Sequence, residues 1–150
     1  MEKNKNEILI KIGLDNIKFG MSPEEVTSLL GEAQEVENLE IDDENTTTIS
    51  HYLDKEFALF FVNSRKPCLE CIETSNRDTL LFGKKIFLLN ECEIISLLTE
   101  NGFSNYETET EIWGEKRLTF EDAMIDFYFD DKHLSVISWG ILIDENGEFC

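Results

Sequence analysis

Two cysteines have the spacing of a metal-binding or redox pair. Cys68 and Cys71 form a C-x-x-C motif, in which two thiolates can hold one metal ion or form a reactive disulfide. A structural zinc site needs four ligands, and the other candidates are scattered without ligand spacing: Cys92, Cys150, His51 and His133. The pair also follows a polar turn at 63–67, whereas a thioredoxin-like pair opens a helix. We therefore expect core or surface thiols, with no metal and no cofactor.

The two histidines are the best candidates for acid–base chemistry. His51 or His133 could act as a general base beside a carboxylate, but neither lies near a recognisable nucleophile. The H-E-x-x-H, G-x-G-x-x-G and G-x-x-x-x-G-K motifs are missing, and the acidic runs 42–45 and 144–147 lack the ligand order of a calcium loop. We expect no enzymatic activity. A small enzyme that uses His51 or His133 with nearby carboxylates is the alternative.

Acidic side chains recur in a pattern that suits a binding surface. If residues 106–113 form a strand, Glu107, Glu109 and Glu111 line one face and Trp113 continues it. The carboxylates of such a ladder repel one another unless water or a basic partner compensates their charge. Trp is a favoured anchor residue at protein interfaces. A solvated face with Trp113 under a loop is the alternative. The predicted partner-binding residues are Glu107, Glu109, Glu111, Trp113, Asp42, Asp43, Glu44, Asp130 and Asp131.

The net charge limits the class of partner. The chain has 13 Lys and Arg against 32 Asp and Glu, which gives a net charge of −19. Such a field repels nucleic acid and anionic membranes, and it steers basic proteins toward the surface. We therefore predict a basic protein partner, with neither nucleic acid nor membrane as ligand. The alternative is an acidic scaffold or adaptor whose charge serves solubility.

Length and composition indicate one folded domain over residues 1–150. Hydrophobic residues make up 41% of the chain and aromatic residues 11%, enough for a core. The first residues lack the pattern of a signal peptide, and no apolar run approaches the roughly 20 residues of a membrane span. We therefore expect a cytoplasmic protein with reduced cysteines.

Two helices with marked ends are predicted to position the rest of the chain. Ser22 and Glu25 form a capping box around Pro23, and Gly31 ends that helix. Asn90 and Glu93 repeat the arrangement for a helix at 90–101 that Gly102 follows. The apolar stripes expected to face the core are Val26, Leu29 and Leu30 in the first helix, and Ile94, Ile95, Leu97 and Leu98 in the second.

Short β-like runs follow each helix. They cover 46–52, 57–62 and 68–73 after the first helix, and 118–120, 124–129 and 134–139 after the second, with outlying strands at 7–12 and 141–143. We predict an α+β fold of two pseudo-repeats, at about 7–75 and 80–143. Each is a helix followed by a three-stranded antiparallel β-meander, and the two sheets are separate or merged.

The first helix also carries a resemblance to known families. The run from Gly20 to Val26, followed by Leu29-Leu30-Gly31, resembles the helix motif of tandem helix-plus-sheet proteins. That group includes β-lactamase inhibitory protein and BamE/SmpA-type assembly lipoproteins. The acidic chain is also similar to immunity proteins of bacterial polymorphic-toxin and contact-dependent inhibition systems. The resemblance implies a protein that binds a basic toxin domain, such as a nuclease, and masks its active site without catalysis. Unlike the secreted comparators, the chain has no signal sequence or lipobox, which favours the immunity interpretation.

Overall fold

The protein is mostly β-structure, in two sheets. The computed structural model describes residues 6–40, 46–63, 67–112 and 114–141. These residues form an eight-stranded sheet, a five-stranded sheet, two α-helices and two short 3₁₀ helices. The predicted fold of two pseudo-repeats, each a helix followed by three strands, is therefore wrong. Four strands follow each helix, and all eight belong to one sheet, while short strands precede each helix in a second sheet.

The bounds of the elements are as follows. The chain begins with β1 (Glu7–Leu9), β2 (Gly13–Leu14), β3 (Ile17–Lys18) and α1 (Pro23–Leu30), and continues with β4 (Glu35–Glu40), β5 (Thr46–Tyr52), β6 (Phe57–Asn63) and β7 (Cys68–Thr74). Its second half holds β8 (Leu80–Leu81), β9 (Lys84–Lys85), η1 (Ile86–Leu88), α2 (Glu91–Glu100), β10 (Glu107–Thr110), β11 (Lys116–Phe120), η2 (Glu121–Ala123), β12 (Ile125–Asp130) and β13 (His133–Gly140).

The large sheet joins two antiparallel meanders at its centre. The strand order is β10-β11-β12-β13-β7-β6-β5-β4, so β4–β7 and β10–β13 meet where β7 pairs with β13. Trp139 of β13 lies opposite Ile72 of β7 at this seam. Gly140 lets the strands approach closely, because a Cβ there would lie 2.5 Å from the Glu70 carbonyl oxygen. β4 and β10 are the two edges.

The small sheet brings the start of the chain beside its middle. Its order is β3-β2-β1-β8-β9, and β1 runs parallel to β8 with Ile8 opposite Leu81. These strands have only two or three residues, too few to show a period of two. Trp139 connects the two sheets, because its indole Nε1 donates a hydrogen bond of 2.9 Å to the carbonyl oxygen of Gly13.

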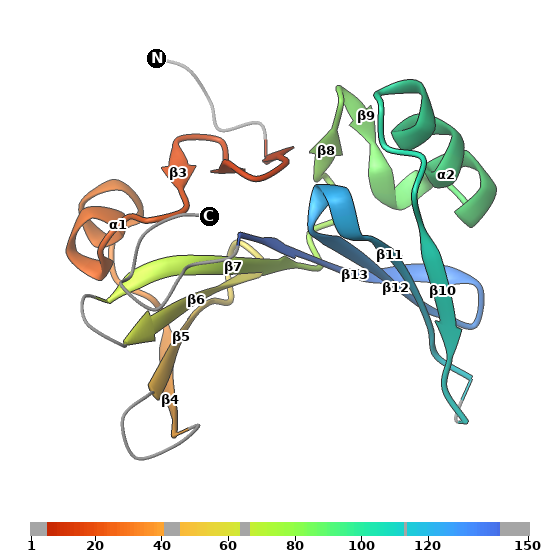
Figure 1. Cartoon of the computed structure of the whole chain (residues 1–150). Coiled ribbons are helices and arrows are strands. Elements are labelled where there is room, and N and C mark those ends of the chain that lie inside the picture. The colour runs from red at the N-terminus through yellow and green to blue at the C-terminus, as the bar shows by residue number, and fades with distance from the viewer. Residues whose placement is uncertain (1–5, 41–45, 64–66, 113, 142–150) are drawn as a thin grey trace.

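Both helices and the small sheet lie on the same side of the large sheet, as Figure 1 shows. The large sheet arches beneath them, and its edge strands β4 and β10 point away from the helices. The core fills the space between these layers, with Val26, Ile94, Phe127, Ile72 and Trp139 among its buried residues. In this view no described element covers the opposite side of the large sheet, which we call the outer face.

The helix caps are as predicted. The Ser22 hydroxyl accepts from the Glu25 amide and the Glu25 carboxylate accepts from the Ser22 amide, both at 3.2 Å. Asn90 and Glu93 form the same reciprocal pair at the start of α2. The predicted stripe of α1 is narrower than expected, because Leu29 is 47% exposed while Val26 is buried.

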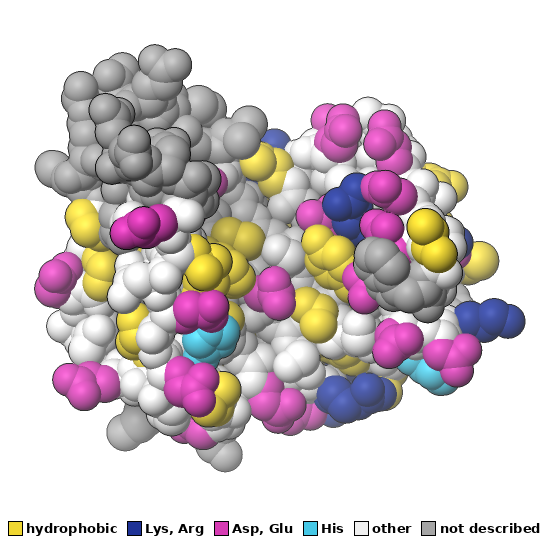
Figure 2. Space-filling view, turned by 90° about the horizontal axis from the view of Figure 1, so that it is seen from below, with side chains coloured by type: hydrophobic (Ala, Val, Ile, Leu, Met, Phe, Trp, Pro, Cys, Tyr) yellow, Lys and Arg dark blue, Asp and Glu magenta, His cyan; other side chains and the backbone are white. Residues whose placement is uncertain are grey.

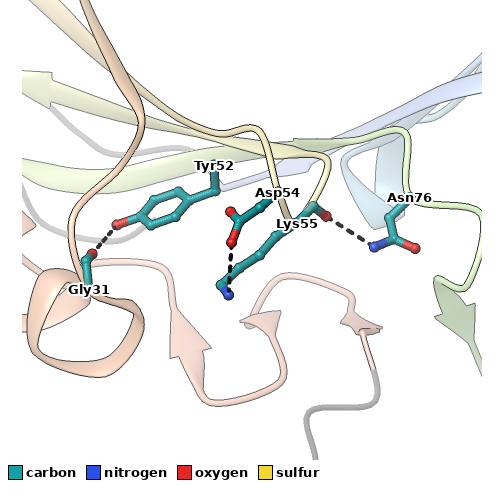
Figure 3. A network of polar contacts seen from close by, with 5 residues as sticks. All are labelled: Gly31, Tyr52, Asp54, Lys55 and Asn76. Atoms are coloured by element: carbon teal, nitrogen blue, oxygen red, sulfur yellow. Dashed lines mark hydrogen bonds and ion pairs between the residues drawn. The ribbon is translucent and has the colours of Figure 1, made fainter.

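Tyr52 ties the end of α1 to the large sheet. Its hydroxyl donates a hydrogen bond of 2.9 Å to the carbonyl oxygen of Gly31, the C-cap residue, as Figure 3 shows. In the same view the side chain of Asn76 donates to the Lys55 carbonyl at 3.0 Å, which holds the β5–β6 turn against the connector after β7. Both contacts lie at the turn end of the β5–β6 hairpin.

Tyr52→Phe is expected to lower the free energy of unfolding by about 0.5–1.5 kcal/mol, because it removes the partly buried hydrogen bond from the Tyr52 hydroxyl to the Gly31 carbonyl. Urea denaturation followed by circular dichroism measures the change. Tyr106→Phe is the matched control, since the exposed Tyr106 ring packs on Phe120 through its aromatic body. Equal stability losses in the two variants would contradict the assigned role of the Tyr52 hydroxyl.

Candidate functional site

The outer face contains a row of residues that crosses all eight strands. Strand register places each member directly opposite the next, in the order Glu35, His51, Ala58, Glu73, Ser138, Asp126, Thr119 and Glu107. We call this set the cross-strand row. At about 4.8 Å per strand it spans roughly 34 Å. It combines carboxylates, a histidine and small residues, and it contains neither lysine nor arginine.

Apolar side chains flank the cross-strand row on both sides. Ile49 and Phe60 face each other across β5 and β6 on one side, and Tyr128 and Val136 across β12 and β13 on the other. Phe60, Tyr128 and Val136 are partly exposed, as are most members of the row. Figure 2 shows this face, where acidic side chains lie around and between hydrophobic patches. Apolar patches bounded by charged groups are the usual make-up of a protein-binding surface.

Positive charge is scarce on this face. Strands β4 to β7 contain no Lys or Arg, and in β10 to β13 these residues are Lys116 and Arg117. The Lys116 ammonium lies 2.8 Å from the Glu91 carboxylate of α2. Arg117 forms an ion pair with Glu109, its cross-strand neighbour. Among the described residues, the remaining carboxylates of the outer face are left mostly unneutralised.

Two of these carboxylates are partly withdrawn from water. Burial raises the pKa of Glu73, although the nearby His51 opposes the shift, and burial also raises the pKa of Glu70. The described ion pairs join Glu37 with His51, Asp54 with Lys55, Glu91 with Lys116 and Glu109 with Arg117, so Glu73 belongs to none of them. A cation placed beside Glu73 would favour the ionised form that burial disfavours.

Glu73→Gln is expected to stabilise the free protein at neutral pH. The pKa of Glu73 is higher in the folded state than in the unfolded state. Its contribution to the stability of the fold is therefore present at low pH and is lost as pH rises through the folded-state pKa. The gain at pH 7 should be about 0.5–1 kcal/mol, as for other improved surface charges, and should shrink toward pH 4. Urea denaturation at both pH values measures it. Glu121→Gln, at an exposed carboxylate in η2, is the control, and an equal gain there would contradict the prediction.

A hollow of about 310 Å³ opens on the outer face beside β5, β6 and β7. His51 and Glu73 line it, together with apolar side chains. The imidazole Nε2 of His51 lies 3.2 Å from the Glu37 carboxylate, so a histidine and two acids come together there. Both histidines considered for acid–base chemistry lie beside hollows: His51 lines this one, and the exposed His133, the first residue of β13, lines a second of about 320 Å³ together with Glu93.

The predicted binding residues separate into three groups. Glu107 and Glu109 lie on β10 and face outward, but β10 ends at Thr110, so Glu111 is outside the ladder. Asp130 ends β12 and Asp131 begins the turn to β13, and both are exposed. Four residues lie outside the described part of the chain: Trp113, Asp42, Asp43 and Glu44.

The cysteine pair lies on β7 and is not arranged as a metal site. Cys71 Sγ lies 3.3 Å from Ser138 Oγ across the seam, and burial raises the pKa of Cys71 to about 11. Burial, and then the charge of Glu70, raise the pKa of Cys68. Within the described ranges no three His, Cys, Asp or Glu side chains gather as metal ligands. At neutral pH both thiols are therefore weak nucleophiles.

The sequence prediction missed Glu35, Glu73 and Asp126. Glu73 and Asp126 are each a single acid between two buried residues of a strand, as in the alternation of Ile125, Asp126 and Phe127, whereas Glu35 lies in β4, which is exposed throughout. This pattern was visible in the sequence. The alignment of the three acids in one row depends on the register of strands far apart in the chain.

Comparisons with known proteins identify no family for this chain. No family model matches the chain, and no curated protein matches it. Among solved structures, it is similar to an extracellular protein containing an SCP domain from Bacillus anthracis, known from a 1.5 Å crystal structure. The identity is 12% and the TM-score 0.48, over 93% of this chain and 47% of the other, so the chain spans about half that protein's length. Neither described α-helix has the length and hydropathy needed to span a membrane.

Proposed function

We propose that this protein is a cytoplasmic bacterial immunity protein, which binds a basic toxin domain through the outer face and blocks the toxin's active site. The observation that carries the proposal is the cross-strand row. Its carboxylates, Glu35, Glu73, Asp126 and Glu107, lie on a sheet face that no described element covers, and strands β4 to β7 contain no Lys or Arg to neutralise them.

The size of the outer face suits a protein partner. Eight strands at about 4.8 Å and six residues at about 3.3 Å give a face of roughly 34 by 20 Å, on the order of 700 Å². A standard protein–protein interface buries about 800 Å² on each partner. The mixture of Phe60, Tyr128 and Val136 with carboxylates favours a partner that presents apolar groups among lysines and arginines, as a nuclease active-site surface does.

The partly buried carboxylates also favour binding over a purely solubilising role. A surface that serves only solubility keeps its charges fully hydrated, whereas Glu73 and Glu70 carry the raised pKa of acids withdrawn from water. Holding unpaired acids in such positions lowers the stability of the free protein, and a cationic partner offsets that loss on binding. Such a trade between stability and function is common at binding sites.

The test uses the basic protein domain encoded by the reading frame next to the gene for this chain. We expect a complex whose dissociation constant rises at least tenfold between 50 and 200 mM salt, because charge steers and holds the partner. Co-expression of this chain should also protect cells from that domain. An affinity that does not change with salt, or the lack of any complex, would reject the proposal.

One observation supports the alternative of a small enzyme. His51 lies at a cavity, next to Glu37 and Glu73, where it could act as a general base. His51→Ala separates the two functions. It would abolish turnover if the protein is an enzyme, whereas an inhibitor should show no turnover with or without this substitution.

A further inference from the structure

The hollow on the outer face is lined by apolar residues and by two carboxylates, Glu56 and Glu73. Its lining comes from the end of β5, the β5–β6 turn, β6, the end of β7 and one residue of β13, and includes His51, Glu56, Ala58, Phe60, Glu73 and Val136. Phe60, Ala58 and Val136 provide partly exposed apolar surface in this lining. The volume of about 310 Å³ is enough for one long side chain of a partner.

The hollow contains negative charge that no described Lys or Arg neutralises. Glu73 lies in its wall, partly withdrawn from water, and belongs to none of the described ion pairs with Lys or Arg. Glu56 is a second carboxylate in the lining. The imidazole Nε2 of His51 is engaged with Glu37 of β4. A half-buried carboxylate in a lining with apolar side chains matches a side chain with an apolar stem and a cationic end.

Between the two long cationic side chains, arginine fits this lining better. Its guanidinium is planar, can bind a carboxylate through two parallel hydrogen bonds, and stacks on an aromatic ring. Glu73 supplies the carboxylate and Phe60 the ring. A lysine ammonium is more strongly hydrated and gains less from a half-dry, aromatic site.

We infer that the hollow receives one arginine side chain of the partner, with its methylene groups on Ala58 and Val136, its guanidinium on Phe60 and its charge paired with Glu73. This inference rests on the proposed function and adds the residue type that anchors the partner. Anchor residues that fill a pocket near the middle of an interface contribute a large share of its affinity, and arginine is frequent among them.

The test is an NMR titration of the ¹⁵N-labelled protein with N-acetylarginine amide. Saturable shifts should concentrate on residues of the hollow: His51, Ala58, Phe60, Glu73 and Val136. N-acetyllysine amide should bind at least fivefold more weakly, and the uncharged N-acetylcitrulline amide should give no saturable shift. Glu73→Gln should weaken arginine binding at least tenfold, whereas Glu121→Gln should leave it unchanged.

Shifts spread over all exposed acids, equal affinities for the arginine and lysine probes, or unchanged affinity in Glu73→Gln would each overturn the inference. Its failure is distinguishable from failure of the proposed function. If the basic domain binds with the expected salt dependence while Glu73→Gln binds it as tightly as the original chain, the anchor pocket is wrong and the binding face stands. If the arginine probe binds as expected and no basic domain does, the pocket stands and the immunity function is rejected.

Discussion

Trp139→Ala is expected to lower the free energy of unfolding by about 3–5 kcal/mol, the range for truncating a large buried aromatic residue. Trp139 is 1% exposed and lies at the seam of the large sheet, opposite Ile72. Its indole also donates to the Gly13 carbonyl, the hydrogen bond that connects the two sheets. The variant loses packing in the core and leaves that buried carbonyl without its donor, which adds to the loss.

A second variant keeps this prediction testable if Trp139→Ala does not fold. Trp139→Phe retains most of the apolar volume and removes the donor, so its loss should be smaller, about 1–3 kcal/mol. Far-UV circular dichroism during urea denaturation measures both, since tryptophan fluorescence changes with the substitution itself. A loss below about 1.5 kcal/mol for Trp139→Ala would mean that the seam is not a centre of stability.

The double charge reversal Glu73→Lys with Asp126→Lys is expected to weaken binding of the basic partner domain by about 30- to 4,000-fold. These residues lie on either side of Ser138 at the centre of the cross-strand row. Losing a partly desolvated charge pair at an interface costs about 2–5 kcal/mol, and tenfold in affinity corresponds to about 1.4 kcal/mol. Isothermal titration calorimetry measures the affinity, and circular dichroism verifies the fold.

The matched control is Glu121→Lys with Asp122→Lys, which makes the same change in net charge in η2, away from the cross-strand row. Both acids are exposed. This control should reduce affinity less than about threefold, mainly through slower association. Equal losses in the two double variants would show that only the overall charge matters, and the outer face would then have no special role.

The sequence predicted the local structure well, because local rules decide it. The capping boxes at Ser22 and Asn90 follow from side-chain chemistry within three residues, and both form as predicted. The runs 46–52 and 57–62 became β5 and β6, since β-branched and aromatic residues suit a pleated sheet. The run 134–139 likewise lies within β13.

The prediction failed where structure depends on distant parts of the chain. β4 and β10 were not counted among the meander strands, because their exposed, acidic sequences lack an apolar face. The parallel pairing of β1 with β8 joins residues more than 70 positions apart, and nothing in either short strand indicates the other. Together these strands turn the predicted pair of helix-plus-three-strand units into two sheets of eight and five strands.

The sequence identified only some of the residues that make up the candidate site. The excess of acid suggested a basic partner, and Glu107 of the predicted ladder lies in the cross-strand row. Glu109 faces outward as predicted, but Arg117 already neutralises it. The row exists because the seam aligns Glu73 of β7 with Ser138 of β13, and that alignment cannot be read from either strand alone.

The β7–β13 seam has a consequence for synthesis on the ribosome. In the large sheet β7 pairs with β6 on one side and with β13 on the other. β7 ends at Thr74 and β13 ends at Gly140, so the ribosome must add 66 more residues before β7 can pair fully with β13. At about 5–20 residues per second this takes roughly 3–13 s. During that interval the nascent first meander presents an unpaired strand edge, the kind of surface on which chains aggregate. Slow decoding between these two strands should therefore reduce the yield of soluble protein, and chaperone binding at this stage should restore it.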